Sequence, residues 1–226
     1  MLNVITPAGD RHEAWALAQE YMAAQSFPGP VRWIVTDDGH KPLKATFRRE
    51  GYSLEIHRLP PMAGNSQSRN LNHALGLADL NSAVVCWEDD DVYLPGYLQT
   101  MVDALATADL VGEAPSRYYN VATSRWRVMG TRGHASLACT ALRGPAVDLL
   151  REICRKGSRR IDMDLWGQFR GTKRLLDTAN VIGIKGLPGR AGIGVGHRSN
   201  FGDPDTTGIL RKWLGDYADN YEVFRH

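Results

Sequence analysis

The order of apolar and polar positions predicts alternating strands and helices in the first half of the chain. Short apolar runs that end in polar or turn residues predict strands, and apolar residues at helical spacing predict helices. The predicted strands are residues 2–8, 31–39, 52–60, 82–91 and 109–114. The predicted helices are residues 10–25, 64–78 and 95–108. This alternation predicts an α/β fold with a largely parallel sheet and helices on both faces.

The second half of the chain follows a less regular pattern. Aromatic residues and arginines interleave over residues 117–130, which predicts a β-hairpin, and an apolar strand is predicted within residues 134–144. Helices are predicted at residues 145–157, 162–171 and 209–224. Residues 183–208 are rich in glycine, as is typical of a mobile lid. No repeat or linker interrupts the chain, so we expect one domain over residues 1–226, with halves at 1–105 and 106–226.

Polar residues follow three of the predicted strands at the points where those strands end. They are Thr6-Pro7, the run from Thr36 to Gly39, and the run from Glu88 to Asp91. In open α/β sheets, ligands bind outside the carboxyl ends of the strands. We therefore expect these three clusters to share one crevice.

The run of four carboxylates is the most unusual feature of the sequence. If the strand continues through it, Glu88 and Asp90 point one way, while Asp89 and Asp91 point the other. Asp91 is then placed to cap the helix that follows. Mg²⁺ and Mn²⁺ prefer such oxygen ligands, often together with substrate phosphates. A solvated acidic turn is the alternative interpretation.

The composition is that of an ordinary globular protein. Of 226 residues, 43% are hydrophobic and 23% are charged, and no apolar run approaches the ~18 residues of a membrane span. A basic leader with an apolar core is absent from the N-terminus, so no signal peptide is expected. Three widely spaced cysteines without a CxxC motif favour free thiols and a cytoplasmic location.

The charge is unevenly spread, although the net charge is only +2. Residues 1–100 carry 8 Lys/Arg and 12 Asp/Glu, a net charge of −4, whereas residues 151–174 carry 8 Lys/Arg and 3 Asp/Glu, a net charge of +5. Such asymmetry suits an anionic partner, either a nucleic acid or a lipid surface. A solvated helix face would explain it equally well.

Four stretches together resemble the GT-A-fold glycosyltransferases of the family-2 type. They are "VITPAGDR", "WIVTDDGH", "SQSRNLNHAL" and "CWEDDDVYLP", in the order and spacing of that family over roughly residues 1–105. Two positions depart from the family pattern. Glu88 stands where the metal motif usually begins with Asp, and His40 stands where Ser usually follows Asp-Asp-Gly.

The resemblance implies a GT-A-like, Rossmann-type fold, with flanking helices and an irregular C-terminal half that binds the acceptor. It also implies a nucleotide-sugar donor and a bound Mn²⁺ or Mg²⁺. Asp90 would bind the metal, and Asp37 or Asp38 would accept a hydrogen bond from the N3–H of uracil. The residues expected to bind the donor are Thr6, Pro7, Asp37, Asp38, Arg69, Glu88, Asp89 and Arg198. An ion pair that only joins two loops is the alternative role for Arg69.

The segment "RRIDMDLWGQFR" resembles the family's catalytic-base motif, with Ile161 where the family has Glu. The resemblance makes Asp162 the base and Asp164 the second candidate. A simple helix N-cap is the alternative for Asp162. His197, in the glycine-rich loop, is a candidate third metal ligand.

These features predict an inverting glycosyltransferase that moves a hexose from a UDP-sugar to an acceptor hydroxyl. The basic segment suggests an anionic acceptor, for example hydroxymethylated phage DNA. Two alternatives remain open. One is a nucleotidyltransferase, which also combines an α/β sheet with carboxylates and a metal. The other is a nucleic-acid-binding module whose transferase site has degenerated.

Overall fold

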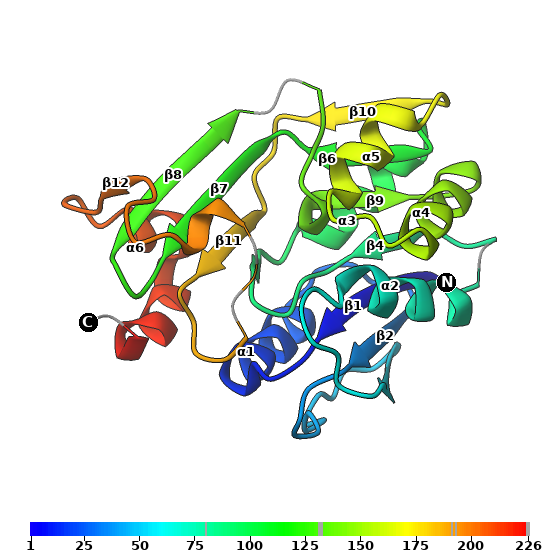
Figure 1. The fold of residues 1–226 in the computed structure, drawn as a ribbon. Coiled ribbons are helices and arrows are strands. Elements are labelled where there is room, and N and C mark those ends of the chain that lie inside the picture. The colour runs from blue at the N-terminus through cyan, green and yellow to red at the C-terminus, as the bar shows by residue number, and fades with distance from the viewer. Residues whose placement is uncertain (80, 131–132, 191, 193, 225–226) are drawn as a thin grey trace.

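The computed structural model describes residues 1–79, 81–130, 133–190, 192 and 194–224 (Figure 1). Of the predicted glycine-rich loop, residues 191 and 193 lie outside this description. Buried apolar side chains from both halves of the chain form one cluster, which includes Trp33 from the first half and Leu142 from the second. Among the described residues, no helix has the length and apolar character needed to cross a membrane.

The larger sheet has seven strands in the order β10-β6-β9-β4-β1-β2-β3. Strand β1 pairs in parallel with β2 and β4, β2 with β3, and β6 with β10, whereas β9 runs antiparallel to β4 and β6. The strands are β1 (Leu2–Ala8), β2 (Val31–Asp37), β3 (Tyr52–Arg58), β4 (Val84–Cys86), β6 (Leu110–Glu113), β9 (Thr140–Leu142) and β10 (Lys173–Leu176). The mostly parallel α/β sheet predicted from the sequence is confirmed.

Helices cover both faces of this sheet. Trp15 of α1 packs on Trp33 of β2, with ring centroids 4.9 Å apart. The Thr36 hydroxyl, three positions along the same strand, donates to the carbonyl of Asn70 in α2 at 3.1 Å. Side chains at odd spacing point to opposite faces of a strand, so α1 and α2 lie on opposite sides. The helices are α1 (His12–Ala23), α2 (Gln67–Leu77), α3 (Tyr97–Leu105), α4 (Pro145–Arg155), α5 (Ile161–Gln168) and α6 (Ile209–Leu214).

A second sheet of five strands, in the order β12-β8-β7-β11-β5, stands beside the first (Figure 1). Its strands are β5 (Val92–Tyr93), β7 (Pro115–Asn120), β8 (Arg125–Gly130), β11 (Val181–Lys185) and β12 (Asp203–Pro204). Strands β7 and β8 form the predicted antiparallel hairpin. Because β4 belongs to the first sheet and β5 to the second, the acidic run lies in the turn that joins the two sheets.

Three local predictions from the sequence are wrong. The strand predicted at residues 82–91 ends at Cys86, and a turn replaces its extended continuation, so the alternation of the four carboxylates does not hold. Asp91 caps no helix, because α3 begins at Tyr97 after Gly96. The predicted closing helix at residues 209–224 is the short α6 followed by a 3₁₀ segment, Gly215–Phe224.

The packing around Gly112 in β6 gives a test of the fold. A methyl group at this position would lie 2.5 Å from Ala135 Cβ and 2.9 Å from both the Cys139 carbonyl and the Trp166 ring. We expect Gly112→Ala to lower the free energy of unfolding by about 1–3 kcal/mol, because a packed interior resists added volume. Urea unfolding followed by circular dichroism measures the change.

Gly76→Ala is the matched control, because a methyl group on this residue of α2 meets no atom within 4 Å. Alanine favours a helix over glycine by about 1 kcal/mol, so this variant should be neutral or more stable. Equal stabilities of the two variants would contradict the packing of β6 described here.

Candidate active site

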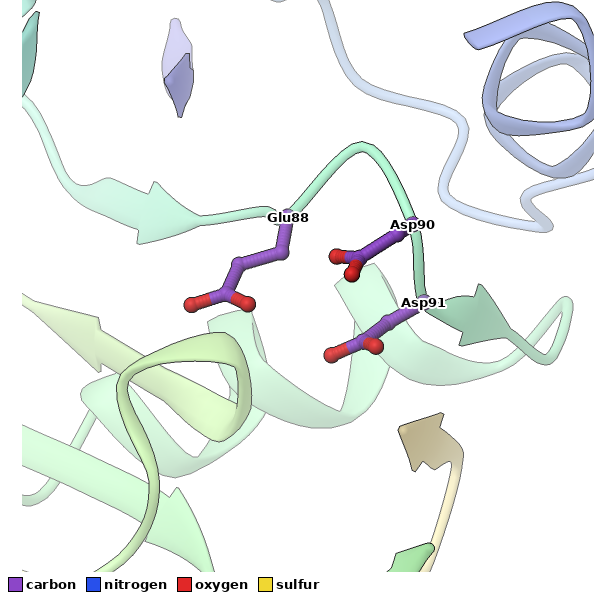
Figure 2. A group of neighbouring side chains, drawn as sticks. All are labelled: Glu88, Asp90 and Asp91. Atoms are coloured by element: carbon purple, nitrogen blue, oxygen red, sulfur yellow. The ribbon is translucent and has the colours of Figure 1, made fainter. Parts of the chain in front are cut away.

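The turn between β4 and β5 brings three carboxylates together. Glu88, Asp90 and Asp91 each offer an oxygen, and these oxygens lie within 4.8 Å of one another. Figure 2 shows the three side chains converging from this turn. Asp90 and Asp91 are buried, and Glu88 is partly buried. The cluster therefore differs from the solvated acidic turn that the sequence left open.

A buried lysine and a partly buried arginine partly compensate the acidic run. The Lys185 ammonium, at the end of β11, lies 2.9 Å from Asp91 Oδ1 and 3.6 Å from Asp90 Oδ2. Arg11, in the turn after β1, forms an ion pair with Asp89 and lies 3.4 Å from Asp90 Oδ2. Four carboxylates against two cations leave two negative charges when all groups are ionised, which is the charge that one divalent cation would neutralise.

The pKa values of these groups reflect incomplete compensation. Burial, together with Asp91 and Asp90, raises the pKa of Glu88 to about 8. Burial likewise raises the pKa values of Asp89 and Asp91. Burial also acts to raise the pKa of Asp90, but Arg11 and Lys185 outweigh it and hold that pKa below its ordinary value. Asp90 is therefore ionised at neutral pH. Of the four carboxyl groups, Glu88 has the most strongly raised pKa.

The residues of this cluster fit a hard divalent cation. Asp90 Oδ1 is buried and has no hydrogen-bond partner among the described residues. An uncompensated buried carboxylate oxygen is costly, and Mg²⁺ or Mn²⁺ would satisfy it with the carboxylate ligands that these ions prefer. His197, on the 3₁₀ turn Val195–His197, lines the same cavity. Burial and Lys185 lower the pKa of its imidazole, which favours the neutral form that binds metals.

The cluster opens into a cavity of about 600 Å³. Six residues expected from the sequence to bind the donor or the metal, or to act as the base, line this cavity: Pro7, Asp38, Glu88, Asp90, Asp162 and His197. They come from the ends of β1, β2 and β4, from α5, and from the segment after β11. The prediction that the polar ends of the first, second and fourth strands share one crevice is therefore confirmed by the structure.

Other predicted residues lie behind the cavity wall. Thr6 is buried, and its hydroxyl accepts a hydrogen bond from the Trp33 indole at 2.8 Å. Asp37 pairs with Arg58 and accepts hydrogen bonds from the backbone amides of Gly39 and Leu43, each at 2.9 Å. These contacts shape the ends of β1 and β2.

Three more predicted residues are also absent from the wall. Asp89 points to Arg11, as described above. The hydroxyl of Ser158 donates to Asp164 at 2.6 Å. Arg198 is exposed and is not among the residues that line the cavity. The roles of all three remain predictions.

Asp162 lies in the first turn of α5, whose N-cap is Arg160. Its carboxylate accepts a hydrogen bond from the Met163 amide at 2.9 Å and borders the cavity. Arg159, one residue before the cap, borders the cavity too. The position of Asp162 is therefore compatible with a base that faces an acceptor.

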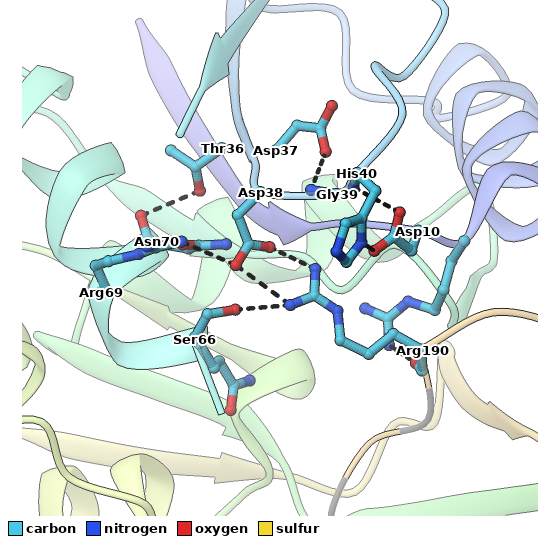
Figure 3. Close-up of polar contacts among 12 residues, drawn as sticks. Asp10, Thr36, Asp37, Asp38, Gly39, His40, Ser66, Arg69, Asn70 and Arg190 are labelled. Atoms are coloured by element: carbon cyan, nitrogen blue, oxygen red, sulfur yellow. Dashed lines mark hydrogen bonds and ion pairs between the residues drawn. The ribbon is translucent and has the colours of Figure 1, made fainter. Parts of the chain in front are cut away.

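Asp38 is held by two arginines (Figure 3). Arg69 Nη2 lies 2.8 Å from Oδ2, and Arg190 donates from Nη2 to Oδ1 at 2.5 Å and from Nη1 to Oδ2 at 3.2 Å. Burial acts to raise the pKa of Asp38, but the hydrogen bonds and the charge of Arg190 lower it overall. The ion pair considered for Arg69 from the sequence is present.

Sequence reasoning missed Arg11, Lys185 and Arg190, which supply the positive charge of the site. A lysine that ends the apolar strand "VIGIK" was a usable signal, because a buried lysine needs a carboxylate partner. Arg11 directly follows the first strand and its Asp10, which is a weaker signal. Nothing local distinguishes Arg190, since its partner Asp38 lies 152 positions earlier.

The raised pKa of Glu88 predicts a pH dependence of stability. A folded-state pKa of about 8, against an ordinary 4.5, favours the protonated carboxyl in the folded protein. The contribution of Glu88 to the free energy of unfolding is therefore complete below pH 4.5, and it is lost as the pH rises to about 8. In a chelator, we expect the unfolding free energy of the unmodified protein to fall by about 3–4 kcal/mol relative to Glu88→Gln between pH 5 and pH 8.

Urea unfolding at pH 5, 6.5 and 8 measures this difference. Asp89 and Asp91 act in the same direction and His197 in the opposite one. All three titrate in both proteins, so the difference from Glu88→Gln reports Glu88 together with its interaction with Asp90 and Asp91. Glu20→Gln, on an exposed position of α1, is the control and should run parallel to the unmodified protein. Parallel curves for all three proteins would contradict the raised pKa.

Similarity to known proteins is found among solved structures. No protein-family model and no curated protein matches the chain. Solved structures of S. aureus TarS are similar: one has a TM-score of 0.58 at 15% identity over 81% of this chain. TarS 1-349 in complex with UDP has a TM-score of 0.59 at 14% identity, and its complex with UDP-GlcNAc 0.56 at 15%, each again over 81% of this chain.

The chain covers 36% of the first of these TarS chains, and 60% and 58% of the two complexes. At such low identity the similarity concerns the fold. The GT-A-like fold expected from the four sequence stretches is thereby confirmed.

Proposed function

We propose that the protein is a metal-dependent glycosyltransferase that moves a hexose from a nucleotide diphosphate sugar, such as a UDP-sugar, to an acceptor hydroxyl. The observation that carries this proposal is the buried, unpartnered Asp90 oxygen within three converging carboxylates, in a cavity shared with Asp38 and Asp162. The similarity to TarS 1-349, whose structures include complexes with UDP and UDP-GlcNAc, supports a nucleotide-sugar donor.

The donor end of the cavity lies between Pro7, Asp38 and the acidic cluster. Pro7 would pack beside the nucleobase, and Asp38 would accept a hydrogen bond from its N–H. Asp90, Asp91 and Glu88, with His197 as a further candidate, would hold Mn²⁺ or Mg²⁺. When bound, this ion would neutralise the diphosphate of the leaving nucleotide. Lys185 and Arg11 keep the carboxylates oriented toward the cavity.

The acceptor end of the cavity would be formed by α5 and the residues before it. Asp162 would take the proton of the acceptor hydroxyl as it attacks the sugar, which is the requirement of an inverting transfer. Arg159 lines the cavity, and Arg155, Lys156 and Arg160, which are close to it in the sequence, are exposed. This series of basic side chains supports an anionic acceptor, for which hydroxymethylated DNA is our candidate.

We also propose that residues 1–226 act as one domain in the cytoplasm. The single apolar cluster joins the donor and acceptor halves, and a site shared by both halves requires them to stay together. All three cysteines are free and buried, which suits a reducing compartment.

Replacement of the central carboxylate tests the metal site. We expect Asp90→Asn to weaken UDP binding in the presence of Mn²⁺ by at least about tenfold, because the neutral amide is a poor ligand for a hard cation. Without Mn²⁺, both proteins should bind UDP weakly and to the same extent. Calorimetric titration with UDP, with and without Mn²⁺, gives the four affinities.

Asp103→Asn, on an exposed position of α3, is the matched control and should bind like the unmodified protein. UDP affinity that is indifferent to both Mn²⁺ and Asp90 would contradict the metal-dependent transferase. Salt-sensitive oligonucleotide binding under those same conditions would favour the nucleic-acid-binding alternative instead.

The two candidate bases can be separated by kinetics. We expect Asp162→Asn to lower the rate of UDP release from the best of a panel of nucleotide sugars by about 10²–10⁴, while UDP affinity is unchanged. Asp164→Asn should have a small effect, because Asp164 bonds to Ser158 and does not border the cavity. The reverse order of the two effects would contradict the assignment of Asp162.

A further inference from the structure

The segment after β11 runs along the cavity and places the Arg190 guanidinium on Asp38. We propose that Arg190 is a donor-binding residue that exchanges partners, from Asp38 in the nucleotide-free protein to the diphosphate of the bound donor. The exchange frees Asp38 to bind the nucleobase. Binding of the diphosphate by Arg190 therefore favours binding of the nucleobase by Asp38. This inference rests on the nucleotide-sugar donor proposed above.

The charges around Asp38 allow Arg190 to leave. One carboxylate faces two guanidinium groups, since Arg69 lies 2.8 Å from Oδ2 while Arg190 contacts both oxygens. Asp37 adds no free negative charge, because it is paired with Arg58. If Arg190 departs, Arg69 still compensates Asp38, and the large cost of an unpaired buried carboxylate does not arise.

Arg190 lies close enough to the acidic cluster to reach a diphosphate bound there. The Arg11 guanidinium contacts Asp90 Oδ2 at 3.4 Å and the carbonyl oxygen of Arg190 at 3.5 Å with the same nitrogen, Nη1. The main chain of Arg190 is therefore separated from Asp90 by a single guanidinium group. Rotation of the Arg190 side chain can redirect its guanidinium toward the diphosphate while the backbone stays in place. A guanidinium binds phosphate oxygens in the same two-pronged manner as a carboxylate.

Two glycines, Gly9 and Gly189, allow Arg190 and the backbone beside it to pack closely against their neighbours. A methyl group on Gly9 would lie 1.9 Å from Arg190 Nη2 and 2.7 Å from Asp38 Oδ1, so the guanidinium packs directly on the backbone there. Gly189 has φ +105°, and a methyl group on it would lie 2.0 Å from the Asp10 carbonyl. The backbone of the segment is thus docked closely against the turn after β1, while the guanidinium makes hydrogen bonds to Asp38 and to the Ser66 hydroxyl.

Binding of UDP and of uridine to Arg190→Ala distinguishes an exchange from a structural role. The variant loses the contact to the diphosphate, so UDP should bind about tenfold or more weakly in Mn²⁺. Uridine has no diphosphate and must displace Arg190 from Asp38 in the unmodified protein. Its affinity should therefore be unchanged or higher in the variant. Calorimetry measures UDP, and NMR titration measures the weaker uridine.

Arg190→Lys keeps the charge but cannot span both oxygens, so its UDP affinity should lie between those of the other two proteins. Arg48→Ala is the matched control: this exposed arginine bonds only to the carbonyl of Phe47 among the described residues, and its loss should alter neither affinity.

Two results with Arg190→Ala would overturn the exchange while the proposed function stands. One is an equal loss of UDP and uridine affinity, which indicates a structural role, and the other is no loss of UDP affinity. If the unmodified protein binds no nucleotide with or without Mn²⁺, the exchange and the proposed function fail together.

Discussion

The four carboxylates in the turn between the two sheets need positively charged partners. This need for charge compensation determines which segments meet at the centre of the molecule. The charge comes from Arg11 after the first strand and from Lys185 at the end of β11, so the turn is tied to segments far apart in the sequence. Burial makes each unpaired carboxylate costly, which is why a buried lysine and a partly buried arginine lie against them. The compensation is incomplete, and the unpartnered oxygen of Asp90 marks where a divalent cation fits.

The cavity has two groups of charged side chains near it. Near Glu88, Asp90 and Asp91, negative charge exceeds positive charge, whereas near Asp38 two arginines face one carboxylate. A nucleotide diphosphate with a bound cation carries both signs of charge, and it can satisfy both places at once. The complementarity to such a ligand therefore extends beyond the metal cluster.

The second sheet completes a site that the first sheet begins. The parallel strands β1, β2 and β4 deliver Pro7, Asp38 and Glu88 at their carboxyl ends, as expected for an open α/β sheet. Strand β11 pairs with the short β5 immediately after the acidic run and thereby places Lys185 on Asp91. The segment that leaves β11 then brings Arg190 and His197 to the cavity.

The sequence by itself determined the alternation of strands and helices, the hairpin at residues 117–130, and the crevice at the strand ends, because apolar periodicity and turn residues are local properties. It also identified Glu88, Asp90 and Asp38, since charged residues directly after buried strands are visible in a linear pattern. Only the tertiary structure decided the directions of the four carboxylates, because a turn toward the second sheet replaced the extended backbone. The tertiary structure alone also decided which cations pair with these carboxylates and that Arg190 pairs with Asp38. These partners are separated by 78 to 152 positions and meet only when both sheets have formed.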